Sequence, residues 1–278
     1  MQACLLPGVD APLYYSVQGN KSLPVLLCVH GVAESSAVWQ PAIEQLSRTH
    51  CCIAVDLPGH GYSAGLRGNW SMHFYAQVLR QFMQQMQLHN VTLLAHSMGA
   101  QIAAVLALQV PAWINSMIWV APAGVETFTA DEANALKQFT AQHWQTPPSA
   151  EQAAAQFKVH FAHATGATGF LQKLAEYYAP ERIADFREVV AGSVNGMLAE
   201  PVHAFLPQLR MPVYVLMGER DLLVPNRFLH PALTPQYILD EARKLLPNSK
   251  TTLAKNAGHF LPVEQPDVLA AAVQQLTL

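Results

Sequence analysis

The stretch Val91-Thr-Leu-Leu-Ala-His-Ser-Met-Gly-Ala100 (VTLLAHSMGA) begins as an apolar run and ends in a serine with small residues two positions before and after it. A second apolar run with helical character, residues 101–109, follows directly. The pattern has two interpretations. Ser97 is either a nucleophile held out on a sharp strand-to-helix turn or an ordinary helix cap. The residues in the loops that follow the other strands distinguish between these two interpretations.

Apolar runs with the length of strands alternate with helical patterns along most of the chain. Strands are predicted at residues 13–17, 24–29, 51–55, 91–94, 116–120, 211–217 and 251–253. Helices are predicted at residues 39–46, 73–88, 101–109, 235–246 and 266–276. This alternation favours a mostly parallel sheet with helices on both faces. Because such sheets bind ligands at the carboxyl ends of their strands, chemistry is expected in the loops that follow them.

The alternation stops between residues 124 and 207, where no convincing buried strand occurs. Helical stretches near 130–143, 150–162 and 180–190 predict a helical insertion that forms a lid over the strand ends. The core is then divided into residues 1–123 and 208–278. The aromatic residues of the insertion are expected mostly to form its own core, with a substrate pocket as the alternative: Trp144, Phe157, Phe161, Phe170, Tyr177, Tyr178 and Phe186.

The bulk properties exclude several classes of function. The 278 residues are 51% hydrophobic and carry a net charge of −3 without a basic block, so we expect no nucleic-acid partner. The start of the chain lacks a signal-peptide pattern. Pro111 interrupts the most membrane-like segment, so no membrane insertion is expected. The four cysteines lack zinc or redox spacing and are predicted to be buried thiols in a cytoplasmic protein. The oligomeric state is left open.

Two polar residues follow the last two predicted strands. Asp221 lies in Gly218-Glu-Arg-Asp221, and His259 lies in Asn256-Ala-Gly-His259. Both should meet Ser97 at the same edge of the sheet. A serine hydroxyl needs an imidazole to take its proton, and a carboxylate to orient that imidazole. The sequence therefore predicts a catalytic triad of Ser97, Asp221 and His259.

Four motifs in order carry a resemblance over nearly the whole chain: His30-Gly31, Asp56-Leu-Pro-Gly-His-Gly61, Ala95-His-Ser-Met-Gly99, and the loops of Asp221 and Gly258-His259. This pattern resembles the α/β-hydrolase superfamily. The resemblance implies an α/β fold with an eight-stranded, mostly parallel sheet, a helical cap and the triad. It also implies an oxyanion hole made by the backbone N–H groups of Val32 and Met98. Glu126 is the competing acid, because some members place the acid after the strand that here ends at Val120.

One position departs from the usual nucleophile elbow of this superfamily. Ala95 stands where the first glycine of G-x-S-x-G is usual. The small residues let the strand and the helix approach closely around the serine. A methyl group is expected to fit there.

Other polar residues near these motifs are expected to be structural. These are His30 and His60 in their loops, and Asp56, which should fix its own turn. His96 should point away from the pocket. Glu34 could touch the substrate or seal the oxyanion loop, and the sequence does not separate these roles. His160 and His163 could share a helix face, but no third ligand is near, so no metal site and no cofactor are expected.

The predicted function is a cofactor-independent serine hydrolase. It would cleave a carboxylic ester or thioester of a small to medium, fairly apolar small-molecule substrate through an acyl-enzyme. Because this fold does not fix the reaction, C–C bond hydrolysis, perhydrolysis, lyase chemistry and acyl transfer are alternatives. Val32-Ala-Glu-Ser-Ser36 lacks the glycine-rich stretch frequent in C–C hydrolases. A slow-turnover ligand receptor is a further alternative, against which the intact triad argues.

Overall fold

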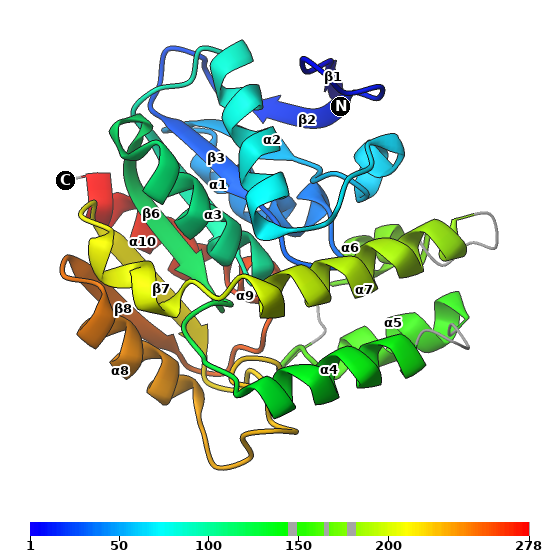
Figure 1. The fold of residues 1–278 in the computed structure, drawn as a ribbon. Coiled ribbons are helices and arrows are strands. Elements are labelled where there is room, and N and C mark those ends of the chain that lie inside the picture. Colours follow the sequence, from blue (N-terminus) through cyan, green and yellow to red (C-terminus); the bar gives the residue numbers. More distant parts are fainter. Residues whose placement is uncertain (144–148, 164–166, 177–181, 278) are drawn as a thin grey trace.

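The computed structural model describes residues 1–143, 149–163, 167–176 and 182–277 (Figure 1). Within these ranges one sheet has the strand order β1-β2-β4-β3-β5-β6-β7-β8. The strands are β1 (Gln2–Cys4), β2 (Leu13–Gln18), β3 (Val25–Val29), β4 (Cys51–Val55), β5 (Val91–His96), β6 (Ile114–Val120), β7 (Val213–Gly218) and β8 (Ser249–Ala254). β1 and β2 pair antiparallel and the other six strands are parallel. The predicted eight-stranded, mostly parallel sheet is confirmed.

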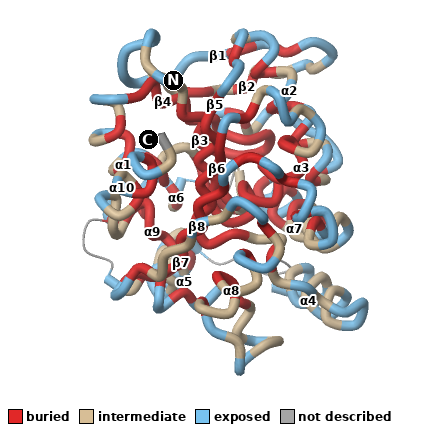
Figure 2. Tube along the Cα trace, turned by 90° about the vertical axis from the view of Figure 1, so that its left-hand side faces the viewer, coloured by how far each residue is buried: buried red, intermediate tan, exposed pale blue. Residues whose placement is uncertain are grey.

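Helices bury both faces of the sheet. One face packs against α2 (Met72–Gln85), α3 (Met98–Gln109) and α8 (Pro235–Leu245), and the other against α1 (Gln40–Leu46), α9 (Leu261–Glu264) and α10 (Pro266–Thr277). In β3, Leu27 and Val29 belong to the first layer, whereas Leu26 and Cys28 belong to the second. Figure 2 shows the central strands of the sheet as the buried centre of the molecule, whereas the edge strands β1 and β8 are less buried. Burial on both faces explains why these strands read as continuous apolar runs.

A group of helices lies between β6 and β7. These are α4 (Ala130–His143), α5 (Ala150–Lys158), α6 (Thr168–Ala175), α7 (Ile183–Ala199) and the 3₁₀ helix η5 (His203–Gln208). In Figure 1 α4, α5, α6 and α7 lie at the end of the sheet to which β6 points, with α4 and α7 side by side. No buried residue occurs in α4, and Figure 2 shows it at the periphery.

The aromatic residues of these helices mostly form a core, as expected. Phe161, Phe170 and Phe186 are buried in one cluster, and Phe157 packs against it. Trp144, Tyr177 and Tyr178 lie outside the described residues. The cluster also contains Phe260 from the loop after β8, whose ring stacks 4.7 Å from that of Phe161. The helices between β6 and β7 therefore share a core with the sheet domain.

Several elements differ from the prediction. The sequence patterns predict neither the three-residue edge strand β1 nor the helices α6 and α9. α7 continues to Ala199, nine residues beyond the predicted end. Gly192 and Gly196 lie within this extension, and a Cβ at either position would come within 2.4 Å of Trp70. These glycines therefore allow close packing of the helix on the core, although glycine weakens a helical pattern in the sequence.

The four cysteines are all free and buried. No helix of the described part of the chain is long and apolar enough to span a bilayer.

Candidate active site

Ser97 occupies the corner between β5 and α3 with φ +51° and ψ −120°. This backbone conformation is unfavourable for a residue with a Cβ, and it is held by a hydrogen bond of 2.9 Å from Ser97 N–H to the Val120 carbonyl. The Ser97 side chain makes no capping hydrogen bond to α3. The interpretation of Ser97 as an ordinary helix cap is therefore wrong.

Small residues allow the close contacts around this corner. A Cβ on Gly99 would lie 2.5 Å from the Val29 carbonyl oxygen. A Cβ on Gly31 would lie 2.9 Å from the Cβ of Ser97. Ala95, at the position of the usual first glycine, is fully buried within β5 and fits without disrupting the strand pairing.

The structure brings together His259 and Asp221. His259 Nδ1 lies 2.8 Å from Asp221 Oδ2, and both residues are buried. The other oxygen of Asp221 accepts hydrogen bonds from the N–H groups of Leu223 and Val224 at 2.8 and 3.0 Å. Since the carboxylate accepts a hydrogen bond from Nδ1–H, Nε2 is the free, basic nitrogen. Among the described residues, no hydrogen bond joins His259 to Ser97, which is common before a substrate is bound.

Glu126, the competing acid, does not contact His259. Its carboxylate accepts hydrogen bonds from the N–H of Asn226 at 3.0 Å and from Nδ1 of His230 at 2.5 Å. Burial raises the pKa of Glu126. The geometry therefore favours Asp221 over Glu126 as the partner of the imidazole.

Two backbone N–H groups near Ser97 have no partner among the described residues. In the loop after β3, the N–H of Gly31 donates to Glu34 at 3.0 Å and that of Ala33 donates to His60 at 3.3 Å. The N–H of Val32 between them is unused, as is that of Met98 at the first position of α3. These are the two donors predicted from the sequence to form an oxyanion hole.

A pocket of about 600 Å³ opens beside Ser97 and Val32. It lies between the strand ends and the helices that follow β6, and it is mainly apolar. Large side chains of α4, α7 and the loop after β7 form its walls: Leu136, Phe139, Val194, Met197, Leu198 and Leu223. Among the described residues that line it, Glu126 is the one acidic side chain, and neither lysine nor arginine occurs.

A sequence profile of the family described as "alpha/beta hydrolase fold" matches residues 24–266. The chain belongs to this family. Its relatives include a pimeloyl-[acyl-carrier protein] methyl ester esterase from Aliivibrio salmonicida, 28% identical over 89% of this chain and 88% of the relative. A monoacylglycerol lipase from Homo sapiens is 22% identical over 96% of this chain and 79% of the relative.

Solved structures agree on the fold of this α/β hydrolase. A probable hydrolytic enzyme from Pseudomonas aeruginosa superposes with a TM-score of 0.82 at 20% sequence identity, covering 100% of this chain and 93% of that one. At this identity the likeness shows the fold alone.

Two buried histidines of the hydrolase are structural, as predicted. Nε2 of His30 accepts the N–H of Leu57 at 2.9 Å, and Nε2 of His60 accepts that of Ala33. An acceptor nitrogen requires a neutral ring, and burial lowers the pKa of His60 to about 3. Asp56 accepts the N–H groups of Ser36 and Tyr62, which confirms that it holds its turn.

His96 and Glu34 form a buried contact that the sequence did not predict. His96 Nδ1 lies 2.9 Å from the Glu34 carboxylate, and His96 Nε2 lies 2.9 Å from the carbonyl oxygen of His259. His96 does not line the pocket, in agreement with the prediction. Glu34 also accepts the Gly31 N–H, so of its two predicted roles the sealing of the oxyanion loop is the one observed. Atoms of Glu34, His96 and His259 approach within 4.8 Å, a spacing that could hold a metal ion, but Glu34 and His96 bind each other directly.

The segment after α5 contacts the loop of His259. The N–H of His259 donates to the His160 carbonyl at 2.8 Å. Glu264 accepts the N–H groups of Ala162 and His163 with one oxygen and that of Gly258 with the other. Burial and the nearby His259 lower the pKa of His160 to about 4. The predicted shared face of His160 and His163 is thus replaced by backbone contacts to the base loop.

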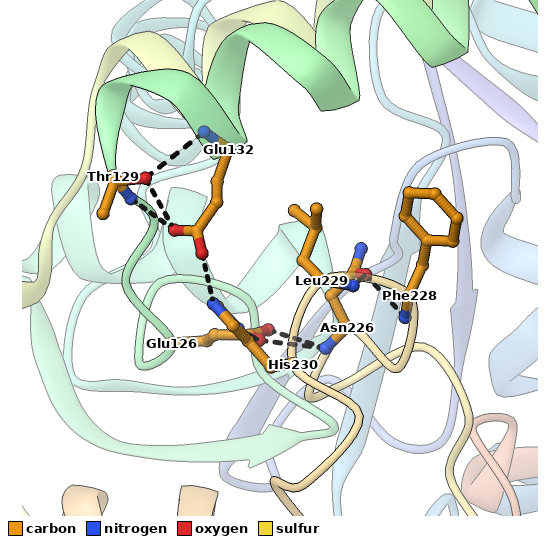
Figure 3. Close-up of polar contacts among 7 residues, drawn as sticks. All are labelled: Glu126, Thr129, Glu132, Asn226, Phe228, Leu229 and His230. Atoms are coloured by element: carbon orange, nitrogen blue, oxygen red, sulfur yellow. Dashed lines mark hydrogen bonds and ion pairs between the residues drawn. The ribbon is translucent and has the colours of Figure 1, made fainter.

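A second network of histidine and glutamate lies at the rim of the pocket (Figure 3). His230 contacts Glu126 through Nδ1, and its Nε2 lies 3.2 Å from Glu132. The His230 ring stacks on Phe128 with a centroid distance of 5.5 Å. Burial lowers the pKa of His230, but the hydrogen bonds and charges of the two glutamates outweigh it and raise the pKa. This rim network joins the start of α4 to the loop after Asp221.

Proposed function

We propose that this protein is a serine hydrolase that cleaves a carboxylic ester or thioester of a small to medium, apolar acyl group. The observation that carries the proposal is the pairing of His259 with Asp221 beside a serine held at positive φ. The unused N–H groups of Val32 and Met98 support it. In this proposal residues 124–207 act as a cap over the site, between core parts 1–123 and 208–278.

The reaction begins when Ser97 Oγ attacks the carbonyl carbon and His259 Nε2 takes its proton. Asp221 stays ionised and holds the Nδ1–H of the ring, so that Nε2 faces the reaction. The N–H groups of Val32 and Met98 hold the oxyanion. Loss of one such donor typically lowers the rate about 100- to 1000-fold.

Collapse of the tetrahedral intermediate breaks the bond to the leaving group, which receives the proton from His259. The acyl group is then esterified to Ser97. A water molecule gives a proton to His259 and attacks the acyl carbon. The acid leaves as the Ser97 oxygen recovers the proton, which restores the enzyme.

The mainly apolar pocket supports a hydrocarbon acyl chain. Its walls offer the leucine, valine and phenylalanine side chains that bury apolar surface, and pockets of about 300–1,000 Å³ are usual for small ligands. The relatives named as a methyl ester esterase and a monoacylglycerol lipase also act on esters.

The test is a stopped-flow assay with p-nitrophenyl acetate, butyrate and octanoate. Wild type is expected to show a burst of p-nitrophenol followed by turnover, and Ser97→Ala is expected to show neither. Ser22→Ala, at an exposed position away from the pocket, is the matched control and should match wild type. Equal turnover by Ser97→Ala would refute the mechanism, and the absence of both burst and turnover with every ester in wild type would refute the substrate class.

A further inference from the structure

We propose that His96 and Glu34 form a buried imidazolium–carboxylate pair that positions the base His259 and the oxyanion loop for catalysis. The inference rests on the proposed function, because it assigns positioning residues to that same site.

The hydrogen-bond partners of His96 limit the ring to two protonation states. Each ring nitrogen lies 2.9 Å from an oxygen, Nδ1 from the Glu34 carboxylate and Nε2 from the His259 carbonyl. A carbonyl oxygen only accepts, so Nε2 carries a proton. For Nδ1 the alternatives are a protonated ring with an ionised Glu34, or a neutral ring that accepts from a protonated Glu34.

The surroundings of Glu34 favour the ionised pair. Its carboxylate also accepts the Gly31 N–H at 3.0 Å, which favours the anion. Burial raises the pKa of Glu34, but the charge and hydrogen bond of His96 outweigh it and the pKa is lowered. Burial lowers the pKa of His96, but Glu34 outweighs it and the pKa is raised. His30 and His60 differ from His96 because each accepts a backbone N–H and stays neutral.

The charged and titratable groups that face the pair come from the loop of Glu34 itself and from three other loops. The charge of His30 acts to lower the pKa of Glu34, and the charge of Glu34 acts to raise that of His60. The charge of Asp221 acts to raise the pKa of His96. The His259 ring lies 4.7 Å from the His96 ring. The rings of Trp39 and Phe260 cover His96 at 6.4 and 5.7 Å, and the pair is closed to solvent. A cation so close to His259 is tolerable because Glu34 neutralises it.

The pair joins three functional loops. His96 precedes the nucleophile, its Nε2–H holds the carbonyl of the base residue, and Glu34 holds the N–H next to Val32. The pair thus fixes the positions of Ser97, His259 and the oxyanion donor relative to one another. Since a displacement of about 1 Å can lower a rate about 100-fold, loss of the pair should lower kcat and leave KM nearly unchanged.

The first test measures protonation directly in the wild-type protein. NMR of protein labelled with ¹⁵N-histidine, with His96 assigned from the spectrum of His96→Gln, is expected to show both His96 ring nitrogens protonated at pH 7. A single protonated nitrogen would overturn the ion pair. This readout does not depend on turnover, so it distinguishes failure of this inference from failure of the proposed function.

The second test measures positioning. Glu34→Ala is expected to lower kcat about 100-fold with KM changed less than about 3-fold. Glu34→Gln, which can still accept from Gly31, should recover part of the loss. The matched control is Thr92→Val, at the other end of β5, which removes a buried hydrogen bond of 2.9 Å to Ser116 and should leave kcat unchanged. Wild-type kcat in a folded Glu34→Ala protein would overturn the positioning role.

Discussion

The two histidine–glutamate networks of this hydrolase use the same groups in different environments. In the buried pair, His96 and Glu34 are 0% and 2% exposed. In the rim network, the side chains of His230 and Glu132 are 18% and 29% exposed, whereas that of Glu126 is 6% exposed (Figure 3). Each histidine has an acceptor at both ring nitrogens. Solvent can reach His230 and Glu132 but neither His96 nor Glu34, so burial decides how much each contact contributes to stability.

Removing one partner of the buried pair should have the largest effect on stability. Glu34→Ala leaves His96 buried without its counter-charge, which is expected to lower the free energy of unfolding by about 3–5 kcal/mol. Urea denaturation at pH 7 measures this. A loss below about 1 kcal/mol, as for an exposed pair, would contradict the distinction between the two networks.

Replacing both partners should separate stability from activity. Glu34→Met with His96→Leu removes both charges together, and well-packed apolar residues often replace a buried ion pair at little cost. We expect the double variant to recover most of the stability lost in Glu34→Ala while kcat stays about 100-fold below wild type. Recovery of kcat along with stability would show that the pair acts only through folding.

The ionisation of the buried pair should also make the stability of the protein depend on pH. Because the pKa of His96 is raised in the folded protein, its protonation stabilises the fold fully at pH values below the ordinary pKa of 6.5. This stabilisation is lost as the pH rises through the folded-state pKa of His96. Because the pKa of Glu34 is lowered in the folded protein, its ionisation stabilises the fold at pH values above the ordinary pKa of 4.5. This stabilisation is lost as the pH falls through the folded-state pKa of Glu34. The unfolding free energy of wild type minus that of the double variant should therefore peak between these limits. A pH-independent difference would argue against ionisation.

The rim network should give the smallest effect. His230→Gln is expected to lower the free energy of unfolding by about 1 kcal/mol or less, and less in 1 M salt than in dilute buffer. Turnover of p-nitrophenyl acetate should be unchanged within about 2-fold, because His230 does not contact the triad. A kcat loss as large as that of Glu34→Ala would show that the rim, too, positions the catalytic groups.

The sequence predicts contacts that lie within a motif better than those between motifs. The positions of the strands along the chain, the corner at Ser97 and the loop of Asp221 follow local patterns, and the structure agrees with them. The contact of Glu34 with His96 spans 62 residues, and no local pattern indicates it. The one indication in the sequence is that Glu34 lies shortly after the predicted oxyanion loop. That position is compatible both with a contact to the substrate and with sealing of the loop.

The rim network was missed for a related reason. The place of Glu126 after β6 predicts a competing acid and no other role, and His230 lies in a loop without a periodic pattern. The extension of α7 was missed because glycines that allow packing on Trp70 look the same in the sequence as glycines that end a helix. In each case tertiary packing determines the outcome.

The carboxylate of Glu264 has a mechanical consequence for the segment between β6 and β7. It holds the backbone of Ala162 and His163 on one oxygen and that of Gly258 on the other, next to the His259–His160 hydrogen bond. A displacement of residues 160–163, near the middle of the segment, would therefore act directly on the backbone of His259. At the start of the segment, α4 is linked to the loop after β7 by the contact of His230 with Glu132, which solvent can reach. The segment is thus fixed to the sheet domain by a backbone contact at its middle and by a half-exposed side-chain contact at its start.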